Sequence, residues 1–217
     1  METIFVYKVS WRTFAAIMRE KILHNAADLF LTYGFKSVTM DDISNHMGIS
    51  KKKIYQHFIN KTTLVEAVSI HVFDNIACGI DQICSTKKNP IEEVFDIKQF
   101  VMEHLKDEKS SPQFQLQKYY PKIFKTLKQK QFDVMQGCVK DNLSRGVEIG
   151  LYRSNINIEF ISRIYFNSMV GIKDKELFPL THFSMNTLME YFLEYHLRGI
   201  CTEQGILILN KFIKNQS

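Results

Sequence analysis

Apolar residues recur at intervals of three and four along most of the chain, the spacing that gathers them on one face of an α-helix. The 217 residues include only 4 prolines and 9 glycines, so few positions oppose a helical backbone. No segment shows a convincing alternation of apolar and polar residues, as a half-buried strand would. The pattern therefore predicts an all-α protein.

The first helices can be placed from the residues at their ends. A helix is expected over about 18–33, where Gly34 can end it. Thr39 and Asp42 then have the spacing of a capping box, in which each side chain bonds the backbone N–H of the other residue. We expect a short helix to begin there and to stop at Gly48.

The later helices are placed in the same way. Ser50 is an N-cap candidate for a helix over 51–58, and Asn60 for a longer helix that reaches about residue 83. The remaining periodic segments are 91–105, 123–149, 158–172 and 183–198, with a short amphipathic tail at 202–213. The segment 158–172 is apolar around its whole circumference, so we expect this helix to be buried on all sides.

Two short helices joined by a glycine turn, with a longer helix before them, are the components of a helix-turn-helix. Gly48 would permit a left-handed turn between the two. The second short helix would then have one face free to enter a DNA major groove. The apolar residues expected to hold both short helices against the first helix are Ile43, Met47, Ile49, Ile54 and Phe58.

The free face of the second short helix is basic. No acidic residue interrupts its lysines, which are Lys51, Lys52, Lys53 and Lys61. A run of lysines is usually a solvated helix face, but its place in the turn motif favours contacts with nucleic-acid phosphates. The net charge of +5 is too mild to carry this inference without that placement.

Composition and missing motifs exclude several other classes of protein. With 45% hydrophobic and 24% charged residues, the chain is expected to be soluble and globular. The cysteines lack metal-ligand or redox spacing, so we expect buried, reduced thiols and no metal site. Charge interrupts each apolar stretch before the ~18–20 residues that span a bilayer, which predicts a cytoplasmic protein without a membrane partner. Phosphate-loop, G-x-S-x-G and H-E-x-x-H motifs are absent, so we expect neither an enzyme nor a cofactor.

Residues 1–18 are interpreted as a leader separate from the folded domains. They have neither the basic start nor the uninterrupted apolar core of a secretory signal. Met18 stands directly before the first convincing helix. We therefore expect the native chain to start at Met18, with the preceding residues either not native or a disordered arm.

An ordered series of motifs over about fifty residues resembles the N-terminal part of the TetR family of transcriptional regulators. The matching segments are Ala26-Ala-Asp-Leu-Phe30, Tyr33-Gly-Phe35, Thr39-Met-Asp-Asp-Ile43, Met47-Gly-Ile-Ser50 and Ile54-Tyr-Gln-His-Phe58, followed by Asn60-Lys61. A single turn motif would be weak evidence, whereas this series is improbable by chance. The rest of the chain is similar to the family in helix order only.

The resemblance implies DNA-binding roles for eight residues. Positions that contact phosphates in the family are held here by Thr39, Tyr55, His57 and Lys61. Positions that commonly face base edges are held by Lys51, Lys52, Lys53 and Gln56. Lys53 stands where the family usually has a small residue, which leaves its role open between base and phosphate. We expect Tyr55 to point outward and Phe58 to lie in the core.

The resemblance also implies a helix-turn-helix domain at 19–66 and a larger helical domain at 67–217 that binds an effector and dimerises. The helices at 158–172 and 183–198 match the pair that forms the four-helix dimer interface of the family. A homodimer would hold two recognition helices ~34 Å apart, so the operator should be a near-palindrome in double-stranded DNA. The implied function is a repressor that a small-molecule effector releases from the operator.

The effector pocket is the least specified part of this interpretation. The aromatic residues that lie where the family walls its pocket are Phe95, Phe100, Phe114, Tyr119, Tyr120, Phe124, Tyr165 and Phe166. Most of them are expected to be plain core. The competing interpretation of the whole chain is an interaction protein that keeps the family fold but uses its lysines to bind DNA nonspecifically, or to bind another acidic partner.

Overall fold

The structure is a computed structural model that describes residues 2–106, 111–179 and 181–216, with side chains only from residue 14 to residue 214 of these ranges. Throughout the described residues the backbone is helical or irregular, apart from one isolated bridge between Tyr152 and Cys201. The prediction of an all-α protein is confirmed.

The N-terminal part consists of α1 (Glu2–Tyr33), α2 (Met40–Met47) and α3 (Lys51–Tyr55). The helix expected to begin near Met18 instead begins at Glu2, because residues 2–17 contain no proline or glycine that would interrupt it. Met1 lies outside the described residues. The domain boundaries, including the leader at 1–18, remain predictions.

The larger part of the chain contains α4 (Lys61–Ser85), α5 (Pro90–His104), α6 (Pro112–Tyr119), α7 (Pro121–Glu148), α8 (Ile158–Gly171), α9 (Met185–Ile200) and α10 (Glu203–Gln216). The first residues of α5, α6 and α7 are prolines, which fit a first helical turn because its N–H groups need no helical acceptor. The sequence indicated breaks at these prolines, but α6 was not expected because eight residues are too few to show periodicity.

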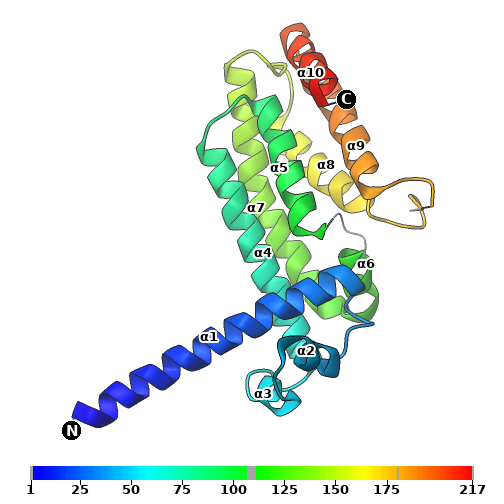
Figure 1. Cartoon of the computed structure of the whole chain (residues 1–217). Coiled ribbons are helices and arrows are strands. Elements are labelled where there is room, and N and C mark those ends of the chain that lie inside the picture. The colour runs from blue at the N-terminus through cyan, green and yellow to red at the C-terminus, as the bar shows by residue number, and fades with distance from the viewer. Residues whose placement is uncertain (1, 107–110, 180, 217) are drawn as a thin grey trace.

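The long helices α4, α5 and α7 lie side by side and form the body of the molecule, with α8 and α9 packed beside them (Figure 1). α1 crosses one end of this body, where α2 and α3 also lie. A core cluster at this end joins α1–α4 to Leu116, Ile123 and Leu127 of α6 and α7. A second cluster, at the other end, contains Tyr152 and Leu197. α4 connects the two ends.

α4 is long and apolar enough to cross a membrane by length and composition, although Glu66 and Asp74 lie within it. Length and composition alone do not make α4 a membrane span, because core helices of soluble proteins share them. In this fold α4 packs against α1, α5 and α7 and contributes Leu64, Val65 and Val68 to the core. Here α4 is one helix of a bundle.

The prediction that α8 is buried on all sides was wrong for the single chain. Phe160 and Ile164 of α8 are 59% and 42% exposed, while Phe166 is buried. The reason is that α8 packs mainly against α7 and α9, which leaves these two side chains uncovered. On α9, Tyr191 and Tyr195 are also exposed.

The expectation of buried thiols holds only for Cys201, because Cys78 is exposed and two cysteines are half-buried. The half-buried cysteines are Cys84 on α4 and Cys138 on α7, and they lie next to each other. All four cysteines are free thiols.

Candidate nucleic-acid interface and internal cavity

The ends of α2 and α3 are fixed by short-range hydrogen bonds. Thr39 Oγ1 accepts from the Asp42 N–H at 3.1 Å, and Asp42 Oδ2 accepts from the Thr39 N–H at 2.8 Å, which completes the predicted capping box. The Thr39 N–H and the Thr39 hydroxyl both donate to Asp42 Oδ2, and these two bonds hold the pKa of Asp42 below its usual value. Gly48 has φ of 62° and begins the left-handed turn, and Ser50 Oγ then accepts from the Lys53 N–H.

The predicted apolar contacts hold this pair of helices against α1. Ile43 and Ile54 are fully buried, and Phe58 is nearly so. Met47 and Ile49 are half-buried and pack on the same cluster, which contains Ile22, Ala26 and Phe30 of α1. Because Ile54 turns inward, the opposite face of α3 points to solvent.

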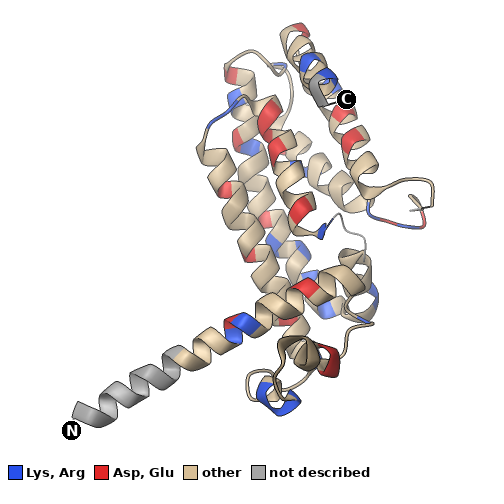
Figure 2. Ribbon diagram, viewed as in Figure 1, with Lys and Arg blue, Asp and Glu red and all other residues tan. Residues whose placement is uncertain are grey.

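The lysines of α3 lie at the end of the molecule away from α10 (Figure 2). The predicted DNA-contacting residues lie on α3 and beside it, with Thr39 capping α2 and Lys61 beginning α4. Most of them are exposed, namely Thr39, Lys51, Lys52, Tyr55 and Gln56, whereas Lys53, His57 and Lys61 are half-buried. Tyr55 is 43% exposed, as expected for an outward phenol. The protein's own body covers none of the exposed group.

α3 is shorter than expected, since it ends at Tyr55 and not at Phe58. The His57 and Phe58 N–H groups both donate to the Ile54 carbonyl, so the chain tightens into a turn there. Gln56 and His57 therefore lie in the turn after the recognition helix. His57 is still close enough to Lys53 to be affected by its charge.

Lys51 is paired with an acidic residue that the sequence interpretation did not connect to it. Its Nζ donates to Asp41 Oδ2 of α2 at 2.7 Å, and this bond raises the Lys51 pKa. Asp41 and Lys51 are ten residues apart, but the turn at Gly48 brings α2 and α3 together. The pair restricts Lys51, so Lys52 is the less restrained of the two exposed lysines.

The surroundings of Lys61 and His57 lower the pKa of both side chains. Lys61 Nζ donates to the Lys36 carbonyl at 3.1 Å, and partial burial lowers its pKa. Partial burial also lowers the His57 pKa, and Lys53 and Arg19 lower it further by repulsion. His57 is thus neutral near pH 7 and can act as a hydrogen-bond partner.

Arg19 of α1 is a basic residue at this surface that the predicted DNA-contacting set did not include. Its guanidinium lies 5.1 Å from the Phe58 ring centre. The only sequence signal was that Arg19 falls off the apolar face of its helix, which is true of most surface residues.

A cavity of about 240 Å³ lies inside the body, between α4, α5, α7, α8 and α9. It reaches from Leu31 and Leu116, near the helix-turn-helix, to Tyr152 and Ile200 at the far end. Of the eight aromatic residues expected at a pocket, Phe124, Tyr165 and Phe166 line it.

The other five predicted pocket residues lie elsewhere. Phe95 packs on Phe212, Phe100 stacks on His104, and Tyr120 belongs to the N-terminal core. Phe114 lies beneath Lys118 and Lys175, and Tyr119 is at the surface beneath Lys36. Tyr120 lies between α6 and α7, and the other four are on helices that line the cavity with other side chains.

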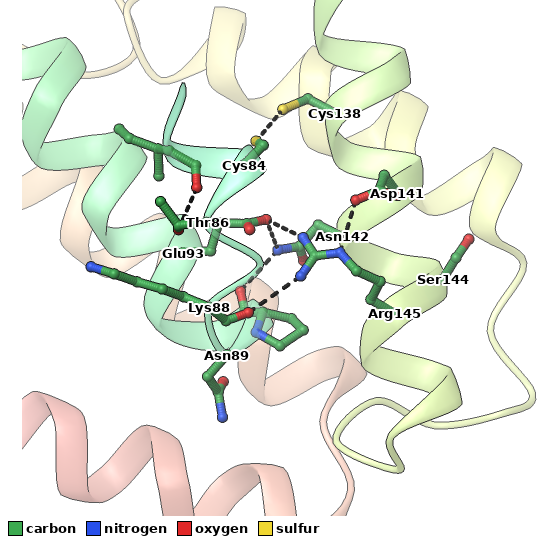
Figure 3. Close-up of polar contacts among 12 residues, drawn as sticks. Cys84, Thr86, Lys88, Asn89, Glu93, Cys138, Asp141, Asn142, Ser144 and Arg145 are labelled. Carbon is green, nitrogen blue, oxygen red and sulfur yellow. Dashed lines mark hydrogen bonds and ion pairs between the residues drawn. The ribbon is translucent and has the colours of Figure 1, made fainter. Parts of the chain in front are cut away.

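The polar groups at the cavity were missed by the sequence interpretation. Glu93 of α5 is fully buried, and its Oε1 accepts from Asn142 Nδ2 at 2.8 Å and from Arg145 Nη2 at 2.6 Å (Figure 3). The Tyr152 hydroxyl donates to Asn142 Oδ1 at 3.1 Å. Among the described residues, neither Glu93 Oε2 nor the buried Ser69 Oγ has a hydrogen-bond partner.

His196 of α9 also lines the cavity, between the rings of Tyr165 and Phe192. Burial lowers its pKa to about 4, so the imidazole is neutral. In the part of the chain that the structure describes, no group of three His, Cys, Asp or Glu side chains is placed to hold a metal ion.

Comparison with known proteins agrees with this geometry. Residues 22–68, which contain the helix-turn-helix, match the family described as bacterial regulatory proteins, tetR family. The HTH-type transcriptional repressor KstR2 of Mycolicibacterium smegmatis is 24% identical over 197 residues, covering 88% of this chain and 94% of that protein. The negative transcriptional regulator IcaR of the Staphylococcus aureus biofilm operon is 39% identical over 49 residues, covering 23% of this chain and 26% of its own.

The solved structures that resemble this fold extend the similarity beyond the N-terminal region. A TetR-family transcriptional regulator from Agrobacterium tumefaciens superposes with a TM-score of 0.68 at 18% identity. The match covers 87% of this chain and 100% of that regulator. Helix order, the buried helix-turn-helix core and the matched motif agree: residues 22–68 carry the DNA-binding domain of the tetR family of bacterial regulatory proteins, and the rest of the chain has the fold of such regulators.

Proposed function

We propose that this protein is a transcriptional repressor that binds a near-palindromic DNA operator as a homodimer and leaves it when a small molecule occupies the internal cavity. The observation that carries the proposal is the orientation of α3. Ile54 is fully buried while Lys51, Lys52 and Gln56 on and beside the same helix are exposed. Such a helix can lie in a major groove without any rearrangement of the core.

Within this proposal the eight predicted residues divide into two sets. Thr39, Tyr55, His57 and Lys61 contact phosphates and set the register of the domain on the duplex. Lys51, Lys52, Lys53 and Gln56 lie close enough to the groove to contact base edges, where lysine can donate to guanine and glutamine can bond adenine. Lys53 can serve either purpose.

The proposed homodimer is supported by the apolar side chains that α8 and α9 leave uncovered. Phe160 and Ile164 on α8 and Tyr191 and Tyr195 on α9 are exposed in the single chain. Pairing these two helices with their copies would remove that surface from water in a four-helix arrangement. A two-fold axis between the chains would also present two α3 helices to successive major grooves.

The proposed response to an effector is supported by the place of the cavity. Its wall includes Val68 and Val72 of α4, the helix that connects the two ends of the molecule, and Leu31 of α1. A ligand that fits only one arrangement of these helices would change the spacing of the two DNA-binding ends. Coupling energies of about 1–3 kcal/mol are typical of such effects.

Negative regulation is inferred from relatives, since KstR2 is named a repressor and IcaR a negative regulator. The matched relatives are regulators and not enzymes, and regulation of transcription implies a location in the cytoplasm with the DNA.

Selection of bound fragments from the host genome, followed by titration of a selected fragment and a scrambled one at two salt concentrations, tests the proposal. Specific binding predicts a preference of at least ~1000-fold for the selected fragment, because specific and nonspecific affinities usually differ by that much or more. Equal affinities would instead support a protein that binds DNA nonspecifically through its lysines.

A further inference from the structure

The polar end of the cavity contains a buried carboxylate with one free oxygen. Arg145 and Asn142 of α7 both donate to Glu93 Oε1, and Glu93 is completely removed from solvent. Its second oxygen, Oε2, has no hydrogen-bond partner among the described residues. A buried carboxylate oxygen without a donor is costly, so this atom favours any occupant that can donate to it.

The neighbouring donors are fixed elsewhere and are therefore not free to satisfy this oxygen. Arg145 Nε donates to Asp141 Oδ2, and its Nη1 to the Lys88 carbonyl (Figure 3). Asn142 Nδ2 also donates to the Pro90 carbonyl, and its Oδ1 accepts from Tyr152. The network holds Glu93 in place and leaves Oε2 as an acceptor.

The rest of the cavity is mainly apolar. Its wall is formed largely by aliphatic, aromatic and methionine side chains from α1 and from α4 to α9. The volume of about 240 Å³ is larger than the ~150 Å³ that accommodates a benzene molecule. Three lysines also reach the wall, Lys98, Lys128 and Lys173, and Lys98 Nζ is paired with Glu190 at 2.9 Å.

We propose that the cavity binds a small apolar compound that carries a hydroxyl or amino group, and that this group donates a hydrogen bond to Glu93 Oε2. The inference rests on the proposed effector site and specifies the chemical class of its ligand. A carboxylate on the same apolar body binds poorly, because it would place an acceptor with negative charge against another acceptor.

Three eight-carbon probes that differ only in the terminal group test the proposal: 1-octanol, octylamine and octanoate. Their affinities for the full-length protein are measured at pH 7 by calorimetry, without DNA. Octanol and octylamine are expected to bind at least ~10-fold more tightly than octanoate. The reason is that octanoate would leave Glu93 Oε2 without a donor, and a buried polar atom without a partner usually weakens binding by at least this factor. Octanoate binding as tightly as the other two, or no binding of any probe, would overturn the proposal.

Glu93→Gln is the matched variant, because its amide can keep one carbonyl acceptor for Arg145 and Asn142 while an NH₂ group replaces Oε2. The preference against octanoate should then fall below ~3-fold, since the amide can donate to a carboxylate. Glu103→Gln is the control, as Glu103 is exposed on the same helix and should leave the order unchanged. If Glu93→Gln fails to fold, the order of the three probes on the natural protein still decides.

Operator release is measured separately from binding. Octanol bound in the predicted order without any change in DNA affinity would contradict the proposed effector response but support the ligand class. Release of the operator by octanoate alone would contradict the ligand class but support the proposed effector response.

Discussion

The sulfur atoms of Cys84 on α4 and Cys138 on α7 lie 2.9 Å apart, although the two residues are 54 positions apart in the chain. The contact links α4, which contributes to both ends of the molecule, to α7, the long helix that also positions Arg145 and Asn142 beside Glu93 (Figure 3). Both thiols are half-buried, and burial raises the pKa of each.

Oxidation of the protein with diamide should join Cys84 to Cys138, because their sulfur atoms are already in contact. The reaction should be slow at pH 7 and faster at pH 9, since the raised thiol pKa values leave little thiolate at neutral pH. Peptide mass spectrometry detects the cross-link, and iodoacetamide labelling of exposed Cys78 confirms reagent access. Oxidised protein in which Cys84 and Cys138 are not joined would contradict the contact.

Two glycines of α7 should respond to alanine in opposite ways. A Cβ at buried Gly146 would overlap the ring of Tyr152, so Gly146→Ala should lower the free energy of unfolding by about 1–3 kcal/mol. Gly137 has no neighbouring atom near its ideal Cβ, so Gly137→Ala should raise it by about 0.5–1 kcal/mol. Urea denaturation measures both, and equal effects would show that the helix rotation is wrong.

His196 should make stability depend on pH between its ordinary pKa of 6.5 and its folded value of about 4. In that window the unfolded chain binds a proton that the folded protein excludes, so the free energy of unfolding decreases as pH falls. The decrease should reach about 3 kcal/mol and be absent above pH 6.5. His196→Leu should flatten the dependence in urea titrations, whereas the control His182→Gln, at an exposed residue, should retain it.

Tyr55→Ala and Gln56→Ala should affect DNA binding differently. Loss of a phosphate contact from Tyr55 should weaken binding to all sequences alike. Loss of Gln56 should alter base preference at one position in each half-site, with a cost of about 1–3 kcal/mol for the preferred base. Sequence selection with each variant tests the assignment, and an unchanged consensus for Gln56→Ala would show that another residue reads that base.

Ile164→Glu on α8 should weaken the proposed homodimer, because it would bury a charge at the interface. Sedimentation velocity should show monomer at concentrations where the natural chain is a dimer. Leu207→Glu is the control, since Leu207 is an exposed leucine on α10 and belongs to neither of the two proposed interface helices. If both variants dissociate alike, or neither does, the interface lies elsewhere.

The helix-turn-helix could be predicted from the sequence because its geometry depends on residues that are close to one another along the chain. Thr39 and Asp42 are three residues apart and bond each other's backbone N–H. Gly48 adopts the left-handed conformation of the turn, and Ser50 caps the helix that follows directly. Ile43, Ile54 and Phe58 then have one face on which to pack. Local hydrogen bonding and apolar spacing were sufficient for this part of the molecule.

The cavity depended on how distant helices rotate against one another, which no local pattern specifies. Glu93 meets Arg145 across 52 residues, and Asp41 meets Lys51 only after the turn has formed. Phe166 faces the cavity whereas Phe95 faces Phe212, although both are aromatic residues on helices of the same body. The sequence determined most of the helices and the DNA-binding motif, while tertiary packing decided which side chains face inward, since that choice minimises exposed apolar surface over the whole chain.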